Sequence, residues 1–152
     1  MMARDILIVD DERDICQLMC ETLEDEGYST RQAHDGPGAI EAVRQRCPSL
    51  VVLDIWLGDS RFDGVRVLEM LMQDYPHLPV VMMSGHGTIE TAVETIKKGA
   101  YDFIEKPFKM DRLLVVVQRA LEAAQLREEN QDLRVRSGVD SLYLEEAVLT
   151  VA

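Results

Sequence analysis

The sequence predicts an α/β fold in which helices cover both faces of a parallel five-stranded sheet. Two observations lead to this prediction. Five short apolar runs alternate with amphipathic segments along the chain, and the connections between them are short. Hydrophobic residues make up 47% of the 152 residues, which is enough to build a core despite a formal net charge of −12.

The first half of the chain begins with a strand and a helix. Residues 5–9 form a β-branched run, and an amphipathic segment follows it. Residues 28–33 predict a weaker strand, and the helix expected over 38–46 has Pro37 near its first turn. Residues 50–53 (LVVL) are apolar enough for a strand that is buried on both faces. The apolar face expected on the first helix consists of Ile15, Leu18, Met19, Thr22 and Leu23.

The second half repeats the alternation. After a loop at 58–64, residues 65–72 predict a third helix, and residues 79–83 and 101–105 predict the fourth and fifth strands. The fourth helix is expected to begin after Thr88 as its cap and to end at Gly99. A long fifth helix is expected to begin near Met110.

The acidic composition excludes several classes of function for this segment. Proteins that bind nucleic acid or anionic membranes need basic surfaces, and the pI of this sequence is about 4.6. Cys16, Cys20 and Cys47 are an odd set without paired disulfide spacing, so we interpret them as reduced thiols. Cys16 and Cys20 could form half of a metal site, but no second pair of Cys or His completes it, so we expect these two to pack in the core. No signal-peptide pattern or membrane-length apolar run is present, and a cytoplasmic location is expected.

Acidic side chains stand where two of the predicted strands end. Asp10 and Asp11 follow the first strand, and Asp54 follows the third. The carboxyl ends of parallel strands lie along one edge of a sheet, where ligands bind. Three carboxylates there would repel one another, so we expect a cation, and oxygen ligands favour Mg²⁺ first and Mn²⁺ second. The alternative is that Asp10 and Asp11 only cap the first helix.

Asp54 is the best candidate for a nucleophile. It ends the most apolar strand, and a carboxylate beside a divalent cation can attack phosphorus. Ser84 and Lys106, at the ends of the fourth and fifth strands, can contact oxygens of a phosphoryl group. Taken singly, Ser84 suits a turn and Lys106 a solvated surface. A cis peptide bond before Pro107 would be one way to aim Lys106 inward.

These residues resemble a known family. Asp10-Asp11, Asp54, Ser84-Gly-His-Gly and Lys106-Pro-Phe, at these spacings, are similar to the receiver domain of two-component response regulators over residues 4–121. The resemblance implies a flavodoxin-like fold with strand order 2-1-3-4-5 and phosphoryl transfer to Asp54 from the phosphohistidine of a sensor histidine kinase. It also implies that Asp11, Asp54 and the main-chain carbonyl of Trp56 bind Mg²⁺, with Asp10 acting through water.

Two segments narrow the resemblance. Residues 84–108 are similar to receivers attached to σ54-dependent, NtrC-like activators, and residues 54–64, a longer loop without proline, resemble NtrX-type nitrogen regulators. No Walker A pattern occurs in the chain. The resemblance therefore implies that ATP and DNA are bound by further C-terminal domains outside this sequence.

The family couples phosphorylation to a hydroxyl and an aromatic side chain, which correspond here to Ser84 and Phe103, with Tyr101 as a second candidate. The alternative for Phe103 is a plain core residue. We expect phosphorylation to change the face formed by residues 90–98, Phe103 and 113–121, and thereby to alter the formation of a homodimer through this face and the linker helix.

We expect a receiver domain over 1–121, a helical linker over 122–137 and a tail or linker over 138–152. Ala123, Leu126, Asn130 and Leu133 follow the a/d spacing of a short coiled coil, but a solvated linker helix is an equal alternative.

Two other functions are possible. One is a dimerisation module that does not depend on phosphorylation. The other is a metal-dependent phosphatase with an aspartyl-phosphate intermediate, but Trp56 stands where such enzymes carry an acid. The resemblance favours a phosphoacceptor signalling domain, which is not an enzyme and assists only its own phosphorylation and dephosphorylation.

Overall fold

A parallel five-stranded sheet forms the centre of the computed structural model, which describes residues 4–58, 63–85 and 89–136, with side chains as far as residue 129. The strand order is β2-β1-β3-β4-β5, so the predicted flavodoxin-like order is confirmed. The strands are β1 (Asp5–Val9), β2 (Ser29–Ala33), β3 (Leu50–Asp54), β4 (Val80–Ser84) and β5 (Asp102–Glu105).

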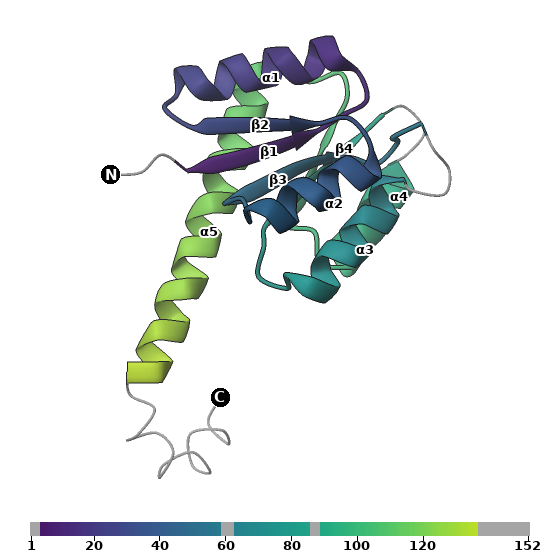
Figure 1. Ribbon diagram of the computed structural model, residues 1–152. Helices are drawn as coiled ribbons and strands as arrows, with labels where there is room; N and C mark the ends of the chain where they lie inside the picture. Colours follow the sequence, from purple (N-terminus) through teal and green to yellow (C-terminus); the bar gives the residue numbers. More distant parts are fainter. Residues whose placement is uncertain (1–3, 59–62, 86–88, 137–152) are drawn as a thin grey trace. The chain divides into compact units, whose positions relative to one another are not determined.

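Helices lie on both faces of this sheet (Figure 1). One face is covered by α1 and by the first part of α5, and the other is covered by α2, α3 and α4. The helices are α1 (Arg13–Asp25), α2 (Gly36–Gln45), α3 (Gly64–Asp74), α4 (Ile89–Lys97) and α5 (Met110–Arg136).

The core has two layers because alternate residues of each strand face opposite sides of the sheet. In β1, Ile6 and Ile8 pack toward α1 and α5, whereas Leu7 and Val9 pack toward α2 and α3. Every residue of β3 and β4 is buried. The ends of these two strands are therefore held firmly by packing on both sides.

The buried face of α1 differs from the prediction by about one residue. Cys16, Met19, Cys20 and Leu23 are buried, whereas Leu18 is 50% exposed, so its assignment to the core face was wrong. Both sets of residues have helical spacing, and only packing against the sheet distinguishes them. Cys16 and Cys20 are buried free thiols, in agreement with the packing interpretation.

Two helices begin at aspartate caps. Asp35 accepts a hydrogen bond from the Gly38 N–H, so α2 begins at Gly36, two residues earlier than predicted. Asp63 accepts one from the Arg66 N–H and starts α3 at Gly64.

The chain divides into two compact units, Met1–Leu121 and Glu122–Ala152. The predicted cap Thr88, the tail at 138–152 and the side chains of Asn130 and Leu133 lie outside the described part of the chain. Among the described residues, no helix is both long and apolar enough to cross a membrane.

Candidate functional site at the carboxyl edge of the sheet

The sequence-predicted site residues meet at one edge of the sheet. Asp54 is the last residue of β3, and Ser84 is the last residue of β4. Asp10 directly follows β1, and Lys106 directly follows β5. Because the strands are parallel, all four residues lie at the carboxyl edge, where open α/β sheets bind ligands.

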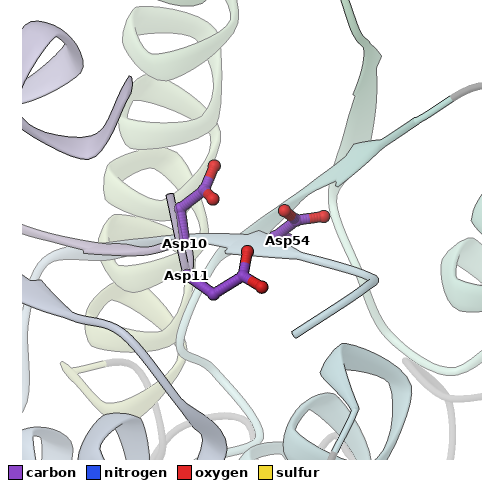
Figure 2. A group of neighbouring side chains, drawn as sticks. All are labelled: Asp10, Asp11 and Asp54. Carbon is purple, nitrogen blue, oxygen red and sulfur yellow. The ribbon is translucent and has the colours of Figure 1, made fainter. Parts of the chain in front are cut away.

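Three carboxylates converge there (Figure 2). One oxygen from each of Asp10, Asp11 and Asp54 lies within 4.8 Å of the others. Asp10 is fully buried and Asp54 is 4% exposed, whereas Asp11 is exposed. The site is therefore an acidic pocket with two buried members and one that faces solvent.

Lys106 bridges the two buried carboxylates. Its Nζ donates hydrogen bonds to Oδ2 of Asp10 at 2.8 Å and to Oδ2 of Asp54 at 2.9 Å. Its main-chain N–H donates to the carbonyl of Ser84 at 2.7 Å, and the Lys106–Pro107 peptide bond is cis. The lysine thus joins β5 to the acidic residues of β1 and β3.

Main-chain N–H groups hold the other oxygens of the same two carboxylates. The Glu12 N–H donates to Oδ1 of Asp10 at 2.9 Å, and the Trp56 N–H donates to Oδ1 of Asp54 at 3.1 Å. The Trp56 indole itself is 66% exposed. Asp10 therefore also caps the start of α1, so its helix-capping role accompanies its place in the acidic pocket instead of replacing it.

Burial and charge have opposing effects on the pKa values of Asp54 and Lys106. Burial raises the pKa of Asp54 above its usual range, and the hydrogen bonds from Lys106 and Trp56 only partly offset this. Burial alone would lower the pKa of Lys106, but its hydrogen bonds to Asp10 and Asp54 outweigh burial and raise that pKa. The ammonium group is therefore held in its charged form.

Ser84 contributes a hydroxyl with an unmet hydrogen-bonding capacity. Its Oγ is buried and has no hydrogen-bond partner among the described residues. A buried polar group in this condition is costly unless a ligand completes it. In the pairing of β3 with β4, Asp54 lies opposite Met83. Ser84 is therefore one residue further along β4 than the partner of Asp54.

Gly64 fixes the backbone of Asp54, and sequence reasoning missed this role. A methyl group added at Gly64 would lie 2.0 Å from the carbonyl oxygen of Asp54 and 2.7 Å from the Cα of Ile55. The Gly64 N–H donates to the Ile55 carbonyl at 2.8 Å. The start of α3 thus packs directly against the end of β3, and the Asp63-Gly64 pair was the available signal.

Comparison with known proteins identifies the family. The family model of the response regulator receiver domain matches residues 6–118. The chain belongs to this family. It is 57% identical over 133 residues, 88% of this chain and 29% of the relative, to the nitrogen assimilation regulatory protein NtrX of Azorhizobium caulinodans. It is 35% identical to DctD, a C4-dicarboxylate transport transcriptional regulatory protein of Rhizobium meliloti, over 87% of this chain and 28% of the relative.

A solved structure shows the same fold. The crystal structure of NtrX from Brucella abortus is 57% identical, with a TM-score of 0.85 over 90% of this chain and 30% of that chain. The resemblance to NtrX-type and NtrC-like receivers is therefore confirmed. The chain spans less than a third of the length of these relatives.

The two aromatic residues named as switch candidates occupy different positions in this receiver domain. Phe103 lies in β5 opposite Met82 and is half-buried against the layer beneath α2, α3 and α4. Tyr101 is exposed and precedes β5, which begins one residue later than predicted. Its main-chain N–H nevertheless donates to the Val80 carbonyl at 2.8 Å.

The donor set fits a small hard cation. The three acidic residues offer only oxygen atoms, which Mg²⁺ prefers, and no His or Cys joins this group among the described residues. Lys106 supplies one positive charge against three carboxylates, which leaves an excess of negative charge at the site. A divalent cation would neutralise this excess.

Proposed function

We propose that this receiver domain accepts a phosphoryl group on Asp54 from the phosphohistidine of a sensor histidine kinase, in a reaction that requires Mg²⁺, and thereby switches the output of a transcription regulator. The observation that carries the proposal is the convergence of Asp10, Asp11 and Asp54, two of which, Asp10 and Asp54, accept hydrogen bonds from the Lys106 ammonium group. The relatives NtrX and DctD, which their names describe as regulators, support the regulatory part.

The chemistry assigns a separate task to each residue. An oxygen of Asp54 forms a bond to phosphorus while the bond from phosphorus to the histidine nitrogen breaks, and the electron pair of that bond remains on the imidazole. Lys106 can donate to one phosphoryl oxygen, and the Ser84 hydroxyl can donate to another. Positioning and charge stabilisation of this kind supply most of the catalysis in phosphoryl transfer.

Asp10, Asp11, Asp54 and the main-chain carbonyl of Trp56 would hold Mg²⁺, with Asp10 acting mainly through water. When bound, the ion neutralises charge on the phosphoryl oxygens. The same oxygen donors would accept Mn²⁺. The buried position of Asp54 in turn keeps bulk water away from most of the nucleophile.

The switch would run from Ser84 to the face formed by α4, β5 and α5. When Ser84 turns toward the phosphoryl group, the space it leaves allows the Phe103 ring, now half-buried, to change its position. Exposed apolar side chains lie on the elements of this face, as expected for a surface that pairs with a second copy. They are Val93, Ile96 and Val115, and the exposed Tyr101 directly precedes β5.

We also propose the arrangement of the longer protein. Residues 1–121 form the receiver, 122–137 a helical linker that assists dimerisation and 138–152 a tail or further linker. ATP and DNA would be bound by C-terminal domains of a σ54-type, nitrogen-related regulator in the cytoplasm. The support is the similarity to NtrX over a part of that protein's length.

Intact-mass measurement after incubation with a small phosphodonor tests the proposal. Wild type should gain the mass of one phosphoryl group with Mg²⁺ and should gain none when the metal is chelated. Asp54→Ala should gain none, whereas Asp14→Ala, which removes an exposed acid of α1, should behave as wild type. An unmodified wild type, or equal modification of Asp54→Ala, would exclude Asp54 as the phosphoacceptor.

The same samples separate the two alternatives. A phosphatase would release phosphate from a phosphate ester over many turnovers, although the Trp56 indole cannot serve as a proton-donating acid. A module that dimerises without phosphorylation would show the same sedimentation before and after phosphodonor treatment. We expect no turnover and a phosphodonor-dependent increase in dimer.

A further inference from the structure

Gly58 lies against the most exposed carboxylate of the acidic pocket. Its φ angle is +81°, a backbone conformation that a side chain rarely adopts and that proline cannot adopt. A methyl group added at this position would lie 3.1 Å from Oδ2 of Asp11. The chain therefore approaches Asp11 at a position where the absence of a side chain leaves room for the carboxylate.

Asp11 has less support than the other two acids. Asp10 and Asp54 are each held by Lys106 and by a main-chain N–H. Within the part of the chain that the structure describes, no hydrogen bond or ion pair holds the Asp11 carboxylate. Gly58 borders the space that the Asp11 carboxylate occupies.

We propose that Gly58 is a positioning residue that sets the cation affinity of the site through Asp11. This inference rests on the proposed Mg²⁺ site and goes beyond it by adding a residue that is not a ligand. A methyl group at position 58 requires Oδ2 of Asp11 to shift by a few tenths of an ångström, which alters its position relative to the other two carboxylates. Mg²⁺ tolerates poor ligand geometry badly, whereas Ca²⁺ accepts variable geometry, so the displacement weakens Mg²⁺ binding more than Ca²⁺ binding.

Gly58→Ala tests the proposal, with Gly27→Ala as its matched control. Gly27 also has a positive φ angle, +94°, but a methyl group there would meet nothing within 4 Å. Both substitutions strain the backbone, and only the first one crowds Asp11. Trp56, the single tryptophan, donates its main-chain N–H to Asp54, so the fluorescence of its indole reports cation binding from a position next to the site.

We expect Gly58→Ala to weaken Mg²⁺ binding on the order of tenfold, the lower end of the effect of residues that support metal ligands. Gly27→Ala should bind as wild type, and the ratio of Mg²⁺ to Ca²⁺ affinity should fall only in Gly58→Ala. If Gly58→Ala does not fold, Gly58→Asn retains the crowding with less strain, because asparagine tolerates positive φ angles.

A double-mutant cycle shows whether the effect passes through Asp11. In an Asp11→Asn background, the further change Gly58→Ala should alter cation affinity much less than in wild type. Equal Mg²⁺ affinity in Gly58→Ala and Gly27→Ala, or an undiminished effect in the Asp11→Asn background, would overturn the role of Gly58 alone. A wild type that binds no Mg²⁺ would overturn both this role and the proposed cation site.

Discussion

At the scale of single residues, Lys106 sets the charge balance of the site. Its ammonium group is shared by two carboxylates whose side chains are 0% and 6% exposed, and it is itself 18% exposed. Buried charges are tolerated when they are paired and are costly when they are not. Lys106 therefore stabilises the fold around Asp10 and Asp54 before any phosphoryl group is present.

Replacing Lys106 by Met should lower the free energy of unfolding by about 3 kcal/mol, since it leaves buried carboxylates without their cation. Lys98→Met is the control, because the Lys98–Glu69 ion pair is exposed and its loss should cost less than about 1 kcal/mol. Urea unfolding followed by circular dichroism measures both. Equal losses in the two variants would contradict the pairing of Lys106 with two buried carboxylates.

The raised pKa of Asp54 predicts a pH dependence of stability in metal-free buffer. Because the folded-state pKa lies above the unfolded-state pKa of about 3.9, the folded protein holds more protons between the two values. The contribution of Asp54 to stability therefore falls as pH rises through this window and stays low above it. The side chain in Asp54→Asn does not ionise. The stability of this variant relative to wild type should therefore increase as pH rises across the window.

Urea midpoints of wild type and Asp54→Asn, measured at a series of pH values with a chelator present, give this difference directly. Asp14→Asn is the control for the loss of one negative charge, because Asp14 is exposed on α1. If the stability of wild type instead increased relative to that of Asp54→Asn as pH rises, the pKa of Asp54 would be lowered in the folded protein. That result would be opposite to the effect of burial.

At the scale of elements, the sequence patterns predicted the order of the strands and the residues at their ends. The apolar run before Asp54 indicated a strand buried on both faces, and β3 is one. The apolar residues of α1 have helical spacing on two overlapping faces, and either face could have been the buried one. The predicted face included Leu18, which is exposed, so that prediction was wrong. The direction in which a helix packs depends on the sheet and on α5, which no local spacing records.

The contacts that support the site were not predictable in the same way. Gly64 against the backbone of Asp54, and Gly58 against Asp11, are close approaches between residues that lie apart in the sequence. A glycine in a sequence shows only that such an approach is possible. Lys106 was expected to contact a phosphoryl group, and the structure adds that it bridges Asp10 and Asp54.

Gly64→Ala should separate α3 from the end of β3. Its methyl group would overlap the Asp54 carbonyl oxygen at 2.0 Å, and backbone atoms cannot move aside as a flexible side chain can. We expect a loss of about 1–3 kcal/mol in unfolding free energy, typical of overpacking, together with slower phosphorylation of Asp54. Gly85→Ala, whose methyl group would meet nothing within 4 Å, should lose much less stability. Thermal melts and intact-mass time courses measure the two effects, and unchanged stability in Gly64→Ala would contradict the close packing.

At the scale of the whole molecule, the net charge of −12 affects stability through two separate routes. Self-repulsion among surface acids weakens the compact state, and any salt screens it. The cluster of Asp10, Asp11 and Asp54 adds a local repulsion that a bound divalent cation would relieve. The two routes respond differently to Mg²⁺ and to Na⁺ at equal ionic strength.

Mg²⁺ should therefore stabilise the protein beyond what NaCl achieves at the same ionic strength. A ligand that binds only the folded state adds RT ln(1 + [L]/Kd), which is about 2.7 kcal/mol at one hundred times Kd. Asp11→Asn should lose most of this specific part, because it removes a proposed cation ligand that is exposed and makes no hydrogen bond within the described residues. Asp14→Asn makes the same change of charge on the neighbouring helix and should keep the specific part. Melting temperatures measured in Mg²⁺ and in NaCl at equal ionic strength give the stabilisation that is specific to Mg²⁺. An equal rise in melting temperature in both salts would show that the acidic pocket responds only to screening.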